Sequence, residues 1–228
     1  MVSSPSAEAL PLSGVGRRHE GNPGQIPTFP ARRARRLGPQ ADRADEPLDD
    51  ALRRARAGDE SGFAELWRSL QPSLLRYLRV RSGGACEDVA AETWLQVVRD
   101  LRSFIGNADG FRAWLFTLAR HRAIDAARAA AARPAVPVPD VSQTGHQPVA
   151  PAAEAGALEE ISTARALELV ATLPPEQAEM VMLRVVAGLD VPTVAQIVGK
   201  SPGAVRVSVH RGLRALSHDP RVTSSEVV

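Results

Sequence analysis

The chain has 228 residues, of which 44% are hydrophobic, 24% are charged and only 4% are aromatic. That length holds one large domain or two small ones, and this composition does not suit a large, aromatic-rich sheet protein. The 28 basic and 26 acidic residues nearly cancel, and the only cysteine, Cys86, excludes an internal disulfide and a multi-cysteine zinc site. We expect no signal peptide and no membrane insertion, and hence a cytoplasmic protein.

Two mildly basic blocks flank an acidic one. Residues 48–133 carry a net charge of +3, residues 134–172 carry −4, and residues 173–228 carry +1. The acidic block begins with a proline-rich stretch that has no aromatic residue. Such a stretch cannot bury enough apolar surface to offset its ordering entropy, which predicts a flexible linker.

The predicted fold class is all-α, with two small helical domains joined by this linker. The terminal segments have the composition of disordered tails. The predicted organisation is a disordered tail at 1–46, a helical domain at 47–133, the linker at 134–157, a helix-turn-helix domain at 158–218 and a disordered tail at 219–228.

Apolar periodicity predicts four helices in the first domain. We expect a short helix from Leu48 to Ala57, then a helix capped by Ser61 that Pro72 kinks or splits. The third and fourth helices are predicted at 86–101 and 110–133.

The third helix has two distinct faces at helical spacing. The side predicted to face the core holds Ala90, Trp94, Val97, Val98 and Leu101. The opposite side holds Asp88, Glu92, Leu95, Gln96 and Arg99. This outer side is either an ordinary solvated face or, because a leucine lies beside the acids, a docking surface.

The fourth helix is unusually apolar at its start. Phe111, Leu115 and Leu118 form the predicted core stripe, from which Phe116 lies well away. A second stripe, within roughly 60° of arc, holds Trp114, His121, Asp125 and Arg128. An aromatic ring, an imidazole and a guanidinium in a row suit a nucleic-acid strand. The alternative is that Trp114 belongs to the core and Asp125 pairs with Arg128.

The second domain has the pattern of a helix-turn-helix. A helix at 158–172, with Ile161, Ala164 and Leu167 inward, precedes one that begins at Pro174 or Pro175. Asp190 caps a short helix, Gly199 makes a tight turn, and Ser201 caps the last helix.

The last helix presents a basic face opposite its apolar one. The predicted inward residues are Val205, Val209, Leu213 and Leu216, and the outward ones are Arg206, Val207, His210, Arg211 and Arg214. A basic helix after a glycine turn is typical of a helix that enters the DNA major groove. The alternative is a plain helical hairpin with a solvated basic face.

These segments together resemble a bacterial family. FAELWRSLQPSLLRYLR, CEDVAAETWLQVVRDLRSF and FRAWLFTLARHRAIDAAR are similar to region two of the sigma-70 family of RNA polymerase sigma factors, in its extracytoplasmic-function (ECF) group. LPPEQAEMVMLRVVAGL and VAQIVGKSPGAVRVSVHRGLRAL are similar to region four. The resemblance covers residues 48–133 and 158–218, in the family's order.

The resemblance implies a site for each partner. It implies that Asp88, Glu92, Leu95 and Gln96 bind core polymerase. It implies that the minus-ten promoter element, melted to a single strand, is bound by Arg102, Phe104, Asn107, Trp114, His121, Asp125 and Arg128. It implies that the duplex minus-thirty-five element is bound by Ser201, Ala204, Arg206, Val207, His210, Arg211 and Arg214. An anti-sigma factor is a further expected partner.

Two other classes of protein compete with this interpretation. A stand-alone helix-turn-helix regulator with a helical sensing domain is the first, although no ligand pocket or dimer surface is visible in the sequence. An enzyme is the second, but no nucleophile–base pair, phosphate-binding loop or metal-ligand spacing occurs. We therefore expect no catalytic residue, no metal, no cofactor and no small-molecule substrate.

Overall fold

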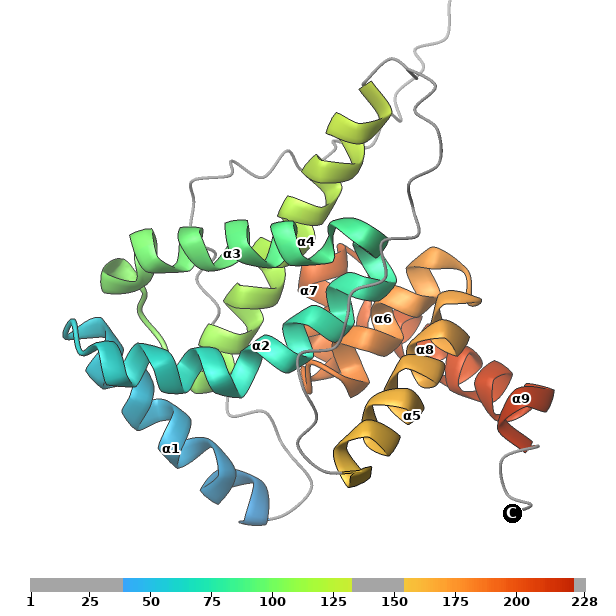
Figure 1. Cartoon of the computed structure of the whole chain (residues 1–228), viewed down its shortest axis with the longest axis horizontal. Coiled ribbons are helices and arrows are strands. Elements are labelled where there is room, and N and C mark those ends of the chain that lie inside the picture. Colours follow the sequence, from blue (N-terminus) through green and yellow to red (C-terminus); the bar gives the residue numbers. More distant parts are fainter. Residues whose placement is uncertain (1–38, 133–153, 224–228) are drawn as a thin grey trace, which may run out of the picture.

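A computed structural model of the chain describes residues 39–132 and 154–223 (Figure 1). Every regular element in these two ranges is helical, which confirms the all-α prediction. The predictions for residues 1–38, for 133–153, which include most of the linker, and for 224–228 lie outside the described residues.

The described helices form an N-terminal and a C-terminal domain, although α5 begins at Glu154, inside the predicted linker, and α9 lies inside the predicted tail at 219–228. The N-terminal domain contains α1 (Pro39–Arg56), α2 (Glu60–Ser82), α3 (Cys86–Asp100) and α4 (Ala108–Ala132), with short 3-10 turns at Gly83–Ala85 and Leu101–Ser103. The C-terminal domain contains α5 (Glu154–Ala171), α6 (Pro175–Val185), α7 (Val191–Val198), α8 (Pro202–Ser217) and α9 (Pro220–Thr223).

The first half of α4 is the centre of the N-terminal domain. This helix crosses behind α2 and α3, and its second half projects beyond them (Figure 1). Phe111, Leu115 and Phe116 have no exposed surface. The prediction that Phe116 lies off the core is therefore wrong: its ring packs edge-on against Tyr77, at 5.5 Å between centroids. Helices on several sides of α4 bury more than one stripe of it.

The first two helices differ from prediction at their ends. Helix α1 begins at Pro39, inside the predicted tail, and Leu48, Ala51 and Leu52 bury its inner side. Helix α2 is capped by Asp59, whose carboxylate accepts a hydrogen bond from the Ser61 backbone N–H at 2.9 Å. The predicted cap, Ser61, instead lies inside the helix and donates its hydroxyl to the same carboxylate.

Pro72 does not end or split α2. The helix runs from Glu60 to Ser82, and Pro72 points to solvent. A proline removes one backbone hydrogen bond and crowds the preceding turn, which normally favours a break. Leu70 and Leu74, on either side of it, are buried in the core and keep both segments in one helix.

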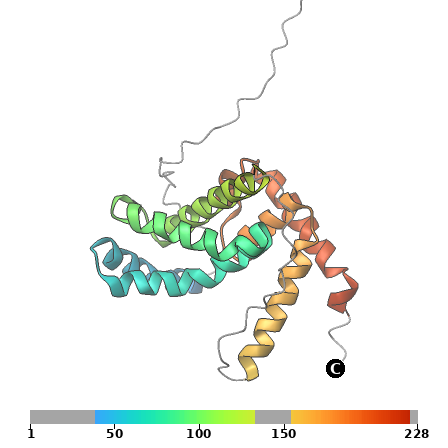
Figure 2. The same cartoon turned by 45° about the horizontal axis from the view of Figure 1, so that its top comes forward.

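Helix α5 is buried over a shorter stretch than predicted. Ile161 is 62% exposed and Ala164 is also exposed, so their predicted inward position is wrong, whereas Leu167 is buried as expected. Figure 2 shows α5 projecting away from the other helices. Helix α5 lies against α2 and α6, and Leu167 is the side chain that it buries there, whereas no neighbouring helix covers Ile161.

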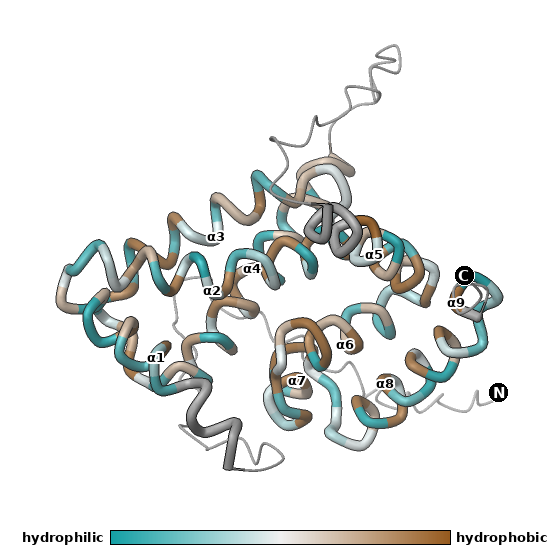
Figure 3. Tube along the Cα trace, turned by 60° about the horizontal axis from the view of Figure 1, so that its bottom comes forward, coloured by the Kyte–Doolittle hydropathy of each residue, from teal (hydrophilic) through white to brown (hydrophobic). Residues whose placement is uncertain are grey.

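The predicted helix-turn-helix is confirmed in its two helix caps and its glycine turn. Asp190 accepts a hydrogen bond from the Thr193 N–H at 2.9 Å, and Ser201 accepts one from the Ala204 N–H at 3.2 Å. Gly199, between them, adopts φ 67°, a left-handed conformation that glycine adopts without steric cost. Figure 3 shows mostly hydrophobic residues along α7 and a mixture along α8.

Helix α8 approaches α6 closely at Gly212. A Cβ atom added there would lie 2.7 Å from a Val181 methyl carbon and 3.2 Å from Gln177 Cγ. The absence of a side chain at Gly212 therefore allows α8 to lie close to α6. Leu213, one position further, is 45% exposed, so its predicted inward position is wrong.

We predict that Gly212→Ala lowers the free energy of unfolding by about 1–2 kcal/mol, because overpacking exceeds the gain in helix propensity. The matched control is Gly203→Ala in the same helix, where the nearest atom to the added Cβ is 3.9 Å away. Denaturant unfolding of both variants measures the effect. Equal stability of the two variants would contradict the close helix contact.

Candidate nucleic-acid interface

The outer face of α3 is acidic and apolar together. Asp88 and Glu92 are exposed, and Leu95 is 57% exposed beside them, as predicted. Val98 was predicted to face inward, but it is 55% exposed and widens the apolar part of this face. We call Asp88, Glu92, Leu95 and Val98 the α3 face.

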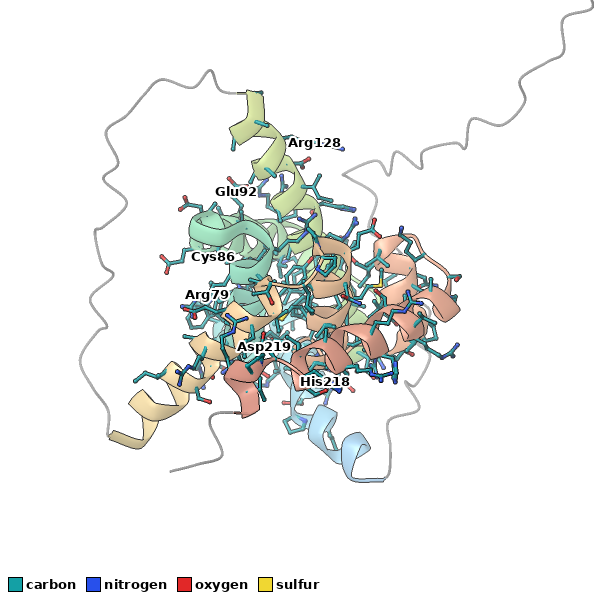
Figure 4. All side chains as sticks on the ribbon, turned by 90° about the vertical axis from the view of Figure 1, so that its right-hand side faces the viewer. Arg79, Cys86, Glu92, Arg128, His218 and Asp219 are labelled. Carbon is teal, nitrogen blue, oxygen red and sulfur yellow. The ribbon has the colours of Figure 1, made fainter. Side chains whose placement is uncertain are left out.

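Gln96 differs from its neighbours on α3. It is half-buried, its amide donates to the Asp100 carboxylate, and its carbonyl oxygen accepts a hydrogen bond from Arg122 at 3.0 Å. Arg122 belongs to α4, so Gln96 ties the two helices together. This contact fixes the α3 face relative to the second half of α4; Figure 4 shows Glu92 and Arg128 at the same end of the molecule.

The structure contradicts the predicted exposure of two aromatic site residues. Trp114 has no exposed surface and Phe104 is 2% exposed. Their rings stack, with centroids 5.1 Å apart, and Phe111 packs against both edge-on, at 5.6 and 5.7 Å. The alternative, that Trp114 belongs to the core, is therefore correct. Neither ring is accessible to a DNA base in this conformation, because helices surround the first half of α4.

The loop before α4 presents a residue that the sequence analysis missed. Ile105, next to Phe104, is 81% exposed. Asn107 was predicted to contact DNA, but its side-chain oxygen accepts a hydrogen bond from the Gly110 N–H at 3.0 Å and so caps α4. Phe104, Phe111 and Trp114 lie within eleven positions of one another, and three aromatic residues so close in the chain tend to pack into one core. This signal could have indicated that Phe104 points inward and its neighbour Ile105 outward.

The second half of α4 is polar and accessible. His121, Asp125 and Arg128 are exposed, as predicted. Arg128 and Asp125 form an ion pair at 3.7 Å, and because both side chains are well exposed the pair contributes little to stability. Burial, then the charge of Arg120, lower the pKa of His121, and Asp125 opposes them only in part. The lowered pKa disfavours the charged imidazolium form of His121.

Helix α8 presents its basic side to solvent. The exposed residues on it include every predicted one, namely Ala204, Arg206, Val207, His210, Arg211 and Arg214, with Ser201 at its N-cap. Val207 is 49% exposed among the arginines. The helix contains no acidic residue. Its arginines are therefore available to an anionic partner.

The described ranges contain no cluster of three or more His, Cys, Asp or Glu side chains that could hold a metal ion. None of their helices is long and apolar enough to cross a membrane.

Comparisons with known proteins agree with this geometry. Residues 66–133 match the family model of Sigma-70 region 2, and residues 163–216 match that of Sigma-70, region 4. The two helical domains thus define a transcription initiation factor with a region-2 and a region-4 domain.

The relatives give the group within that family. The chain is 34% identical over 189 residues to the ECF RNA polymerase sigma factor SigD of Mycobacterium tuberculosis, covering 80% of this chain and 88% of that one. It is 32% identical over 181 residues to the ECF RNA polymerase sigma factor BldN of Streptomyces coelicolor, and this match covers 78% of this chain and 68% of BldN. The chain belongs to the ECF sigma factors of the sigma-70 family.

A solved structure confirms the fold. The chain superimposes on the structure of CnrH in complex with the cytosolic domain of CnrY, with a TM-score of 0.51 and 20% sequence identity. The match covers 75% of this chain and 96% of the matched chain.

We predict that Trp114→Ala lowers the free energy of unfolding by about 3–5 kcal/mol, because it leaves a large cavity beside Phe104 and Phe111. Trp114→Phe retains most of the packing, so its free energy of unfolding falls much less. The control, His121→Ala, changes an exposed side chain and leaves stability nearly unchanged. Urea denaturation measures all three variants. A Trp114→Ala protein as stable as the control would contradict the buried position of the indole.

Proposed function

We propose that the α3 face binds core polymerase, and that the second half of α4 and the recognition helix α8 bind the two promoter elements. The observation that supports this assignment is the exposure of all three surfaces. Asp88, Glu92 and Leu95 on α3 project to solvent, although most of the hydrophobic residues of the N-terminal domain are buried. An apolar residue exposed beside acids is typical of a docking surface.

For the minus-ten element, the proposal assigns the loop at 102–107 and the exposed side of α4. Arg102, Arg128 and His121 are accessible, and Ile105 is the accessible apolar side chain of the loop. A positively charged surface that follows the backbone is the usual way to hold an unpaired strand, and an apolar side chain such as isoleucine can insert between bases. Ile105 replaces Phe104 in this role, and Asn107 positions the loop as the cap of α4.

For the minus-thirty-five element, α8 enters the major groove of the duplex. Arg206 and Arg211 can each bind guanine through two hydrogen bonds, and Val207 suits a thymine methyl group. Ser201 and Ala204 lie at the start of the helix, where helix-turn-helix proteins approach the bases.

The chemistry of RNA synthesis belongs to the polymerase in this proposal. The chain itself then has no catalytic residue and no cofactor, and it acts in the cytoplasm, where promoter DNA is found. An anti-sigma factor is a further proposed partner; the CnrH structure, which has the same fold, is itself a complex with a second protein, the cytosolic domain of CnrY.

We predict that Asp88→Lys with Glu92→Lys weakens binding to core polymerase by at least about tenfold, or about 1.4 kcal/mol. The reason is charge reversal at two exposed carboxylates that no core packing depends on. The measurement is a binding titration with purified core enzyme, accompanied by thermal unfolding.

The matched control is Glu60→Lys with Glu168→Lys, which makes the same change of charge at exposed sites on α2 and α5. Weakened binding in both double variants would mean that overall charge, rather than the α3 face, is responsible.

We predict that Arg206→Ala or Arg211→Ala reduces promoter-specific transcription, and that one of them relaxes the choice of base. Each lost contact to guanine removes about 1–3 kcal/mol of discrimination. Arg165→Ala, at an exposed site on α5, is the control. Run-off transcription with core enzyme on promoter variants is the readout. Unchanged promoter choice in the double alanine variant would exclude α8 as the reading helix.

A further inference from the structure

Helix α1 contacts both ends of the loop at 102–107. The carboxylate of Asp49, in α1, accepts a hydrogen bond from the backbone N–H of Ala108, directly after the loop, at 2.5 Å. At the other end, the Arg102 guanidinium lies beside Gly58, just after α1, where an added Cβ atom would be 3.8 Å from its Nη2 atom. Helix α1 precedes the residues 66–133 that match Sigma-70 region 2, and the proposed function assigns it no partner.

The N–H of Ala108 needs the carboxylate of Asp49. Ala108 is the first residue of α4, and the N–H groups of a first turn have no acceptor inside their own helix. Asn107 supplies an acceptor for one of these groups, the Gly110 N–H. Ala108 is only 1% exposed, so an unpaired N–H there would be costly. Asp49 supplies its acceptor from another helix, and a negative charge is favourable at this end of α4.

Ile105 lies between two fixed points of the chain. On one side, the buried ring of Phe104 stacks on Trp114. On the other side, Asp49 holds Ala108. Gly106, between these points, packs so closely on Phe104 that an added Cβ atom would lie 2.8 Å from the Cζ atom of the ring. The short segment between the two points therefore directs Ile105 outward, where 81% of it is exposed.

We propose that Asp49 is a positioning residue for the minus-ten element: by holding Ala108, it sets where Ile105 meets the unpaired strand. This role in recognition rests on the proposed function, whereas the contact of Asp49 with the loop, which we call the α1 tether, does not. A side chain that meets a base must be held to within about 0.5 Å by its surroundings. Asp49 is half-buried and acts through the loop, without touching DNA itself.

Asp50, the next residue in α1, provides a matched control. Its carboxylate binds Arg53 at 2.8 Å and Arg54 at 2.9 Å, both in the same helix. Asp50→Ala therefore makes the same change of size and charge as Asp49→Ala, at the neighbouring position, without removing the acceptor of Ala108.

Hydrogen exchange in the full chain tests the α1 tether. Asp49→Ala should speed exchange of the backbone amides at 104–111 by at least about tenfold, because the start of α4 opens more readily once Ala108 has lost its acceptor. Asp49→Asn keeps a carbonyl oxygen at the same place and should exchange nearly as slowly as the parent, as should Asp50→Ala.

A second variant guards against misfolding of the first. Asp49→Ser shortens the side chain by one atom and also breaks the contact with Ala108, and circular dichroism shows whether each variant keeps its helices. Exchange as slow as in the parent, in whichever of Asp49→Ala and Asp49→Ser is folded, would overturn the α1 tether.

Strand selection by the chain bound to core polymerase tests the role in recognition. A pool of short single-stranded DNA of random sequence is selected on the parent complex, and the most enriched sequence and a scrambled copy of it become the two probes. The ratio of their affinities should fall about tenfold in Asp49→Ala, an effect of the size of one mismatched base. It should stay near the parent value in Asp49→Asn and Asp50→Ala. A purely structural role for Asp49 would weaken both probes alike and leave the ratio unchanged.

Ile105→Ala separates this inference from the proposed function. If Ile105→Ala lowers the ratio and Asp49→Ala does not, although its exchange is faster, the positioning role of Asp49 is overturned. If Ile105→Ala leaves the ratio unchanged, the role proposed for the loop fails, and hydrogen exchange still decides on the α1 tether.

Discussion

The burial of the first half of α4 on several sides is the constraint from which the N-terminal domain follows. Phe111, Trp114 and Phe116 lie on different sides of this helix, and none has exposed surface. Helices α1, α2 and α3 must therefore pack around it, and the loop before it must turn Phe104 inward onto the indole. The second half of α4, the loop at 102–107 and the outer side of α3 remain accessible to partners.

Much of the fold was predictable because local rules agreed with tertiary packing. The caps at Asp190 and Ser201, the glycine turn at Gly199 and the outward acids of α3 follow from residue type and helical spacing. The burial of Trp114 did not follow, because helical periodicity assumes one buried face and cannot count the helices around a segment. The burial of Phe104 did not follow either, because this residue lies in the loop before α4, where no helical pattern applies. The predicted inward positions of three apolar residues were wrong for the opposite reason, because no neighbouring helix covers them: Val98, Ile161 and Leu213.

The contact between the domains could not be predicted from the sequence either. Glu179 lies in α6, a helix of ordinary amphipathic pattern, and nothing near it in the chain identifies its partners on α2 and α4, which are Tyr77, Arg81 and Arg120. Pairings between residues 59 to 102 positions apart depend on how folded domains meet.

A sigma factor depends on core polymerase for tight promoter binding, whereas a self-sufficient regulator does not. The C-terminal block carries a net charge of only +1, too little for strong phosphate contact by itself. Fluorescence anisotropy on one labelled promoter duplex, with and without core enzyme, measures this difference. We predict binding by the free chain in the range of about 10⁻⁴–10⁻⁶ M at physiological salt, and far tighter, promoter-specific binding once core holds both domains on the DNA. Nanomolar, sequence-specific binding by the free chain, unchanged by core enzyme, would contradict this account.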